Sequence, residues 1–312
     1  MATNSPMQER LAVRFRRFLS GAPDGTPPWL SVVAEGDEPG LYLPSDAPWV
    51  IHGDFGTLVG GIRALLMQAL HPGALAGVAQ HSRYESDPLG RLSGTIRWLT
   101  VTTFGSHTAV ANEARRVNRM HERVTGQFET GAGTSRDYRA ADPDLLLWVH
   151  VAFMESFLRA HENYSSVPIP AGTAPTGADN YVRQWGASVA PLGLDGVPTS
   201  VAELTAVLDG FRDRGELVVS QRTRDVVAFI RKPPLPRAAR GIYALLFQAA
   251  VASLRPDFRE MLGLRTAPRW LVQPSTRTLL RVMRWAIGPE SPIEDAAIAR
   301  LERIGALEAS AR

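Results

Sequence analysis

Helix signals run along almost the whole chain, and long stretches in which apolar and polar residues alternate are absent. Such alternation marks a half-buried β-strand, so its absence argues against a sheet protein. Aspartate–proline steps at Asp87-Pro88 and Asp142-Pro143 mark helix starts, because proline suits the first turn of a helix. With 312 residues and a hydrophobic fraction of 45%, the chain can bury a large core. The sequence therefore predicts an all-α fold.

We expect a single large domain of about twelve helices around a buried pocket. Residues 1–40 should form an N-terminal helix and extension, residues 41–290 the main domain, and residues 291–312 a C-terminal helix. The expected helices cover residues 8–20, 54–70, 72–81, 88–104, 107–125, 143–163, 178–190, 201–211, 220–231, 239–254, 256–263, 267–286 and 292–307. Proline-rich breaks are expected at 165–177 and 232–236.

The composition excludes several classes of protein. The chain has no cysteine, so disulfides, thiolate metal sites and cysteine nucleophiles are ruled out. The formal net charge is +3, and Lys232 is the single lysine among basic residues that are otherwise arginine. Arginine and acidic residues are interleaved along the whole chain, which indicates a solvated surface of mixed sign and not the basic stripe of a nucleic-acid-binding protein.

The sequence also carries signals on location. Residues 1–28 contain several charges and no apolar segment of the kind that begins a secretory leader. The longest nearly unbroken apolar run, Ile242 to Leu254, contains Gln248 and is too short to span a membrane. We therefore expect a cytoplasmic protein without a transmembrane segment. A peripheral membrane contact and the oligomeric state stay open.

Glycines open the second long helix. Gly56 and Gly60 have the Gly-x-x-x-Gly spacing that allows two helices to approach closely. No strand precedes them and no βαβ pattern follows, so they are not a dinucleotide-binding fingerprint. The spacing predicts close helix packing at this point.

The seven histidines are the most informative residues, and six of them lie between His71 and His161. His121 falls on the apolar stripe of its helix, four residues after Val117 and three before Val124. An inward-facing imidazole needs partners for both ring nitrogens. One interpretation is a core histidine bonded to a backbone carbonyl, and the alternative is an axial metal ligand.

His150 and His71 are further candidates. His150 shares a helix face with Leu146 and Phe153, so it too is either a satisfied core histidine or part of a pocket. His71 precedes a short helix that begins at a histidine–proline step. The chain has neither His-Glu-x-x-His nor Glu-x-x-His, so a zinc or di-iron carboxylate site is poorly supported.

The helix that begins at Pro88 has an unusual polar face. Arg91 and Thr95 are four residues apart, and Trp98 and Thr102 continue the same side. Such a face fits the polar lining of a buried pocket. The alternative is a surface face with an arginine whose stem lies along apolar neighbours.

Three segments, in this order, resemble one known family: "QALHPGALAGVAQHSRYESDPLGRLSGTIRW", "FGSHTAVANEARRVNRMHERVTG" and "YRAADPDLLLWVHVAF". They are similar to the domain shared by MpaB-type oxygenases and latex clearing proteins, which are rubber oxygenases. The resemblance is good from about Gly53 to Tyr164 and loose in the C-terminal half. It implies an all-α protein that holds haem b in its helical core and uses dioxygen to attack carbon–carbon double bonds of isoprenoid chains.

The resemblance also implies roles for particular residues. His121 of "RMHERVTG" matches the family's axial haem ligand, and Arg91 and Thr95 match an arginine and a threonine near the active site. The rubber-degrading members have a lysine where this chain has Gly94, so an internal sixth iron ligand of that kind is not expected. The distal glutamate of those members has no clear match, and Glu85 is the nearest candidate.

Together these observations predict a haem b-dependent oxygenase, built as one all-α domain around a buried haem pocket. Its substrates would be dioxygen and a small apolar molecule, with isoprenoids as the class that the resemblance suggests. His121 would ligate the iron, Arg91 and Thr95 would act beside it, and His150 and His71 would line the cofactor site. The competing interpretations are a non-catalytic haem or lipid carrier or sensor with the same fold, and a peroxidase.

Overall fold

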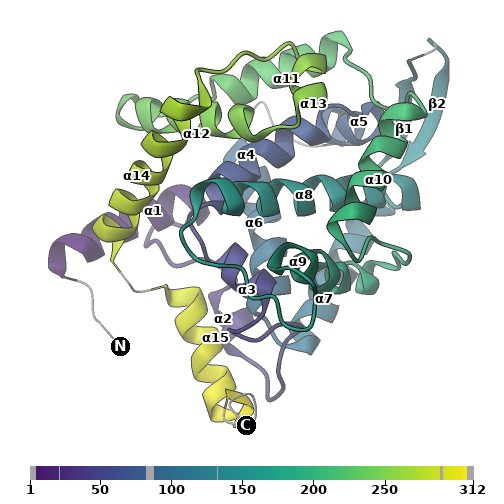
Figure 1. Cartoon of the computed structure of the whole chain (residues 1–312). Helices are drawn as coiled ribbons and strands as arrows, with labels where there is room; N and C mark the ends of the chain where they lie inside the picture. Colours follow the sequence, from purple (N-terminus) through teal and green to yellow (C-terminus); the bar gives the residue numbers. More distant parts are fainter. Residues whose placement is uncertain (1–4, 21, 82–87, 132, 289–290, 308–312) are drawn as a thin grey trace.

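Helix α8 (Pro143–Tyr164) runs through the middle of the computed structural model, and α4 (Thr57–Gln68) packs along it (Figure 1). The two helices approach closely at Gly60, where a Cβ atom would lie 2.6 Å from the Phe157 side chain. A residue larger than glycine would not fit there without movement of the Phe157 side chain or of α8. The close helix packing predicted from the glycine spacing is therefore confirmed at Gly60.

A buried ion pair also joins these two helices. Arg63 of α4 is fully buried, and its Nη2 donates to Glu155 Oε1 of α8 at 2.8 Å. The same guanidinium donates from Nε and Nη2 to the backbone oxygen of Ser253 at 3.1 and 2.9 Å. Because every charge in this group has a partner, α4, α8 and the end of α12 are held together by polar contacts inside an apolar core.

The other elements surround this pair (Figure 1). The structure describes residues 5–20, 22–81, 88–131, 133–288 and 291–307. The elements around α4 and α8 are α1 (Pro6–Ser20), α2 (Leu30–Ala34), α3 (Ala47–His52), α5 (Pro72–His81), α6 (Pro88–Phe104), α7 (His107–His121), β1 (Thr125–Glu129), β2 (Ser135–Arg139), α9 (Gly177–Trp185), the 3₁₀ turns η1 (Gly186–Ser188) and η2 (Ala190–Leu192), α10 (Val201–Asp213), α11 (Gln221–Arg231), α12 (Arg237–Ser253), α13 (Pro256–Met261), α14 (Arg269–Ile287) and α15 (Pro292–Arg303). The mostly helical, single-domain fold predicted from the sequence is confirmed.

Three details differ from the predicted helices. The helix expected over 107–125 ends at His121, and the chain then forms the antiparallel hairpin of β1 and β2. These strands have five residues each, and only Tyr138 is buried, so they show too little alternation to be recognised in the sequence. The short helices α2 and α3 were also not predicted, because five or six residues cannot display a helical period. The helix expected to reach residue 190 instead ends at Trp185 and continues as 3₁₀ turns.

Helices α2 and α15, from opposite halves of the chain, pack against α6. A second apolar cluster brings together Val33 of α2, Phe104 of α6 and Leu301 of α15. Arg300 of α15 is 1% exposed, donates from Nη2 to Phe104 O at 2.9 Å, and also donates to Val33 O. The N-terminal extension and the C-terminal helix therefore support α6 directly.

None of the described helices has both the length and the apolar character needed to cross a membrane.

Candidate functional site

Helices α6 and α7 form an antiparallel hairpin that carries several of the residues expected at the site. The turn between them is tight, because a Cβ on Gly105 would lie 2.5 Å from a carbonyl oxygen of the preceding turn. Halfway along the hairpin, Arg97 Nε donates to Glu113 Oε2 at 2.9 Å. This ion pair fixes which residues of the two helices lie level with each other.

The register places two of the predicted residues at the same end of the hairpin. His121 lies eight residues beyond Glu113, or ~12 Å along α7, and Arg91 lies six residues before Arg97, or ~9 Å along α6. Because the helices run in opposite directions, the backbones of His121 and Arg91 are both at the end remote from Gly105.

His121 is the last residue of α7 and is half-buried. Its Nδ1 is buried and has no hydrogen-bond partner among the described residues. Burial lowers the pKa of the ring, so the imidazole is neutral near pH 7. An unprotonated ring nitrogen of a neutral imidazole is what a metal requires of a histidine ligand. The sequence allowed a core histidine with hydrogen bonds at both ring nitrogens, and the described part of the structure does not show one here.

His150 of α8 has a similar environment. It is 5% exposed, and its Nε2 is buried without a partner in the described part of the chain. Burial lowers its pKa to about 3. Leu146, Val149 and Phe153 lie on the same side of α8 and are only partly buried, although α8 is the central helix. This side of α8 therefore presents an apolar wall with one neutral imidazole in it.

Helix α6 changes character along its length. Residues 93–100 are all partly exposed, Thr95 and Trp98 among them, whereas residues 101–106 are buried. The Thr102 hydroxyl is buried and has no hydrogen-bond partner among the described residues. The polar face predicted for this helix thus contains one unsatisfied hydroxyl. The Arg91 side chain and Glu85 lie outside the described part of the structure.

His71 has a structural role at the start of α5. Its Nδ1 accepts hydrogen bonds from the backbone N–H groups of Gly73 and Ala74 at 3.2 and 3.4 Å, so the ring caps the helix. The ring packs near Trp148 and Phe211, and burial lowers its pKa to about 4. The atom that accepts these bonds must be unprotonated, which leaves Nε2 as the N–H of the neutral ring.

A further buried histidine, His52, was not singled out by the sequence. Its Nδ1 lies 2.8 Å from the Thr103 hydroxyl and its Nε2 lies 3.0 Å from the Tyr181 hydroxyl. Burial lowers its pKa to about 3. This neutral ring is fully satisfied and links α3, α6 and α9. It lies on a six-residue helix, where no periodic pattern could reveal its orientation.

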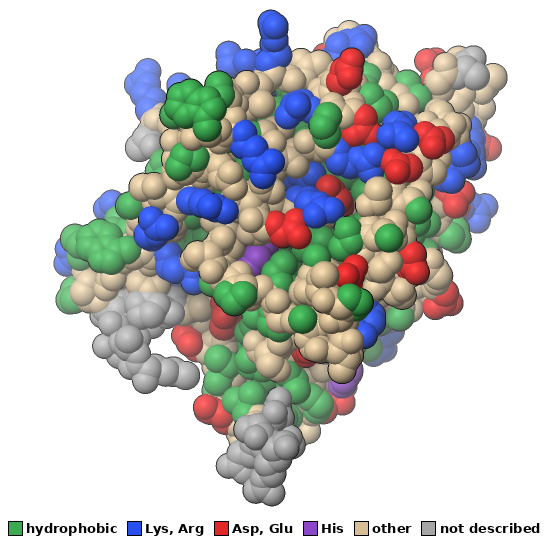
Figure 2. Space-filling model, viewed as in Figure 1, with side chains coloured by type: hydrophobic (Ala, Val, Ile, Leu, Met, Phe, Trp, Pro, Cys, Tyr) green, Lys and Arg blue, Asp and Glu red, His purple; other side chains and the backbone are tan. Residues whose placement is uncertain are grey.

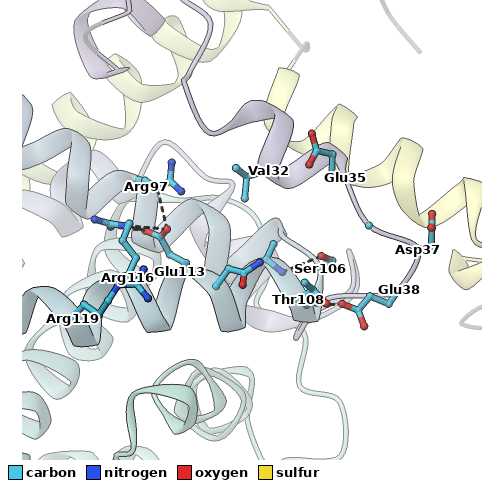
Figure 3. Close-up of a pocket in the computed structure, with 13 residues that line it drawn as sticks. Val32, Glu35, Asp37, Glu38, Arg97, Ser106, Thr108, Glu113, Arg116 and Arg119 are labelled. Carbon is cyan, nitrogen blue, oxygen red and sulfur yellow. Dashed lines mark hydrogen bonds and ion pairs between the residues drawn. The ribbon is translucent and has the colours of Figure 1, made fainter.

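A polar surface pocket of about 630 Å³ opens on the opposite flank of α7 from His121 (Figure 3). Glu113 lies in it, 2% exposed, and is held by Arg97 and by Arg116, whose Nη2 donates to Oε1 at 2.6 Å. These arginines keep the pKa of the Glu113 carboxyl below its usual value against the effect of burial. Glu38, across the pocket, accepts from Thr108 N. Two arginines of the pocket neutralise Glu113, and the mixed acidic and basic lining does not resemble a haem pocket.

The unpartnered nitrogens on α7 and α8 suit a cofactor that needs only one or two ligands from the protein. No group of three or more histidine, aspartate or glutamate side chains among the described residues could hold a bare metal ion. Haem needs only one or two ligands from the protein. The unpartnered nitrogens of His121 and His150 and the apolar wall of α8 are compatible with such a group.

Comparison with known proteins gives a clear family. The family model described as "ER-bound oxygenase mpaB/B'/Rubber oxygenase, catalytic domain" matches residues 49–285, which is most of the chain. The match begins within α3 and ends within α14, and it therefore includes all the candidate residues above. No curated protein and no solved structure matches significantly. The chain therefore belongs to the MpaB/rubber-oxygenase catalytic-domain family of oxygenases.

Proposed function

We propose that the protein is a haem b-dependent oxygenase acting on a small apolar molecule, with isoprenoid chains as the substrate class. Its family consists of oxygenases, which supports the reaction type. The observation that carries the cofactor assignment is the buried Nδ1 of a neutral His121, without a partner among the described residues, at the end of the α6–α7 hairpin where Arg91 also lies.

His121 would ligate the haem iron. Its pKa is lowered by burial, so the ring does not have to lose a proton before it binds the metal. Its position on the last turn of a helix that is packed against α6 restricts the direction of the ring. When bound, haem would supply the iron that binds and activates dioxygen.

Arg91 would bind a haem propionate, because a guanidinium can donate two parallel hydrogen bonds to a carboxylate. Thr95 lies one turn further along α6 and would offer a hydroxyl to dioxygen or to a water molecule in the pocket. His150 and His71 would line the cofactor site as neutral rings.

The apolar wall of α8 supports the choice of substrate. Leu146, Val149 and Phe153 are partly buried and offer few groups that could orient a polar ligand. An apolar pocket also keeps bulk water away from reactive oxygen species, which limits side reactions. A hydrocarbon chain would gain from burial against these side chains.

The first prediction concerns His121. His121→Ala should abolish or strongly weaken stoichiometric haem binding, measured by the Soret absorbance of protein reconstituted with haem, while far-UV circular dichroism stays unchanged. His107→Ala is the matched control, since His107 lies on the same helix and is exposed. In His121→Gly, added imidazole should restore the Soret band because it can occupy the vacated position. Full haem occupancy with an unchanged spectrum in His121→Ala would show that His121 is not the haem ligand.

The second prediction concerns Arg91. Arg91→Ala should increase the rate at which haem is lost to an acceptor protein, and Arg91→Lys should restore only part of the loss because a lysine cannot form the paired hydrogen bonds. Arg115→Ala, an exposed arginine on α7, is the control and should retain haem like the parent. Parental haem retention in both Arg91 variants would assign Arg91 to the surface instead.

The reaction itself is tested by oxygen consumption. The reduced haem protein should take up oxygen and form carbonyl products when given isoprenoid or fatty chains. Haem binding without any substrate-dependent oxygen uptake or spectral shift would favour a carrier or sensor. Turnover that requires hydrogen peroxide and not dioxygen would favour a peroxidase.

A further inference from the structure

The outer face of α14 carries two strongly exposed tryptophans. Trp270 is 77% exposed and Trp285 is 67% exposed. They are fifteen residues apart, which places them on the same side of the helix and ~22 Å apart along its axis. Large aromatic side chains with this exposure are unusual in a protein surface that contacts only water.

Basic residues lie between the tryptophans. Arg277 and Arg281 are exposed on the same side of α14, and the helix contains no aspartate or glutamate between Arg269 and Ile287. The positive charge of this helix is therefore not balanced by acidic residues of its own. The outer side of α14 is therefore both aromatic and basic.

Helix α1 extends this surface. Gln8 Nε2 of α1 donates to the backbone oxygen of Trp285 at 2.7 Å, so the two helices are joined. Met7 is 58% exposed and Leu11 is 38% exposed, and Arg14 beside them is also exposed. Figure 2 shows green and blue side chains together over α14, on the left of the view. We call the exposed residues of α1 and α14 the α1–α14 surface.

We propose that the α1–α14 surface docks on an anionic lipid bilayer, with α14 lying parallel to the membrane plane. Tryptophan partitions to the interface between headgroups and acyl chains, and exposed Met7, Leu11 and Val282 can enter the outer part of the acyl region. The arginines attract anionic headgroups while their stems cover apolar surface. The assignment depends on these residues alone and stands whether or not the protein binds haem.

Two other occupants fit the surface less well. A second copy of the chain, related by a twofold axis through α14, would bring arginines against arginines. A nucleic acid would satisfy the arginines but would leave the exposed methionine, leucine and valine in contact with phosphates and water. A bilayer with anionic lipid is complementary to both the charged and the apolar groups.

Vesicle binding tests the proposal. The full chain should sediment with vesicles of phosphatidylcholine containing phosphatidylglycerol, and much less with phosphatidylcholine alone. Raising the salt concentration should weaken the binding because it screens the arginines. Trp270→Ser/Trp285→Ser should bind at least tenfold more weakly. Each arginine removed in Arg14→Ser/Arg281→Ser should weaken binding about fivefold.

The matched control is Met120→Ser/Arg136→Ser, which removes one exposed apolar residue and one exposed arginine from α7 and β2. It should bind vesicles like the parent. The proposal is wrong if the parent ignores anionic vesicles, or if the double tryptophan variant binds them equally well. It is also wrong if the tryptophan variant changes only a self-association seen by sedimentation velocity, or only the retention of DNA.

Discussion

At the scale of single residues, burial makes three histidines very weak bases. The pKa of His52 and that of His150 are lowered to about 3, and the pKa of His71 is lowered to about 4, in each case mainly by burial. In the unfolded chain a histidine has a pKa of about 6.5. Below that pH the unfolded state takes up protons that the folded state does not bind. Stability from these residues is therefore fully present above about pH 6.5 and is lost as the pH falls to about 4 for His71 and to about 3 for His52 and His150.

The third prediction follows from these values. Between pH 7 and pH 5, the free energy of unfolding should fall by about 2 kcal/mol for each of the three histidines. Glu294 acts in the opposite sense, because burial raises its pKa and the folded state then holds the proton more tightly. Because three histidines oppose this one carboxyl group, we expect a net loss of stability as the pH falls. Urea unfolding of the haem-free chain at the two pH values measures it, and equal stability at both would contradict the assigned burial.

At the scale of elements, Gly60 allows the close approach of α4 and α8. Gly60 lies against Phe157, whereas a Cβ on the next residue, Gly61, would have no atom within 4 Å. Both glycines are in the same helix, so they share the same conformational cost. A difference in stability between alanine variants at the two positions would therefore report the close approach of α8 at Gly60.

The fourth prediction uses this pair. Gly60→Ala should destabilise the protein by about 1–3 kcal/mol, because the methyl group must push α8 away or shift Phe157. Gly61→Ala should be neutral or stabilise by up to about 1 kcal/mol, since alanine favours a helix. Urea unfolding of both variants measures the two effects. A similar response of the two variants would mean that α4 and α8 are less closely packed than described.

At the scale of the whole molecule, α2 and α15, from opposite halves of the chain, meet on α6. Arg300 near the C-terminus binds the carbonyl oxygens of Val33 near the N-terminus and of Phe104 at the end of α6. Helix α6 also contains Arg91 and Thr95. The position of the candidate site therefore depends on contacts between segments that are far apart in sequence.

The fifth prediction tests this connection. Arg300→Met should cost about 1–3 kcal/mol for each carbonyl that is left buried and unpaired. Arg303→Met, on the same helix, removes an exposed arginine that donates to Gly36 O at 2.7 Å, and it should cost less than about 1 kcal/mol. Thermal unfolding of both variants gives the comparison. Equal effects would mean that α15 is only loosely attached to α6.

Local patterns were enough to predict the helical fold and to select the candidate residues. Helix starts, apolar periodicity and glycine spacing are properties of neighbouring residues, so α4, α8 and the contact at Gly60 could be predicted. The resemblance of three ordered segments to one family was likewise a property of the sequence alone. The hairpin of β1 and β2 and the helices α2 and α3 could not be predicted, because each is too short to show a period.

The tertiary structure decided what the histidines can do. The sequence placed His121 and His150 on inward helix faces and offered His71 as a further candidate, but the partners of an imidazole come from residues elsewhere in the chain. His71 caps α5, whereas His121 and His150 each keep a buried nitrogen without a partner among the described residues. Periodicity along a helix fixes the direction in which a side chain points. Only the packing of distant segments fixes which atoms it meets there, and this determines which ring nitrogen is left without a protein partner.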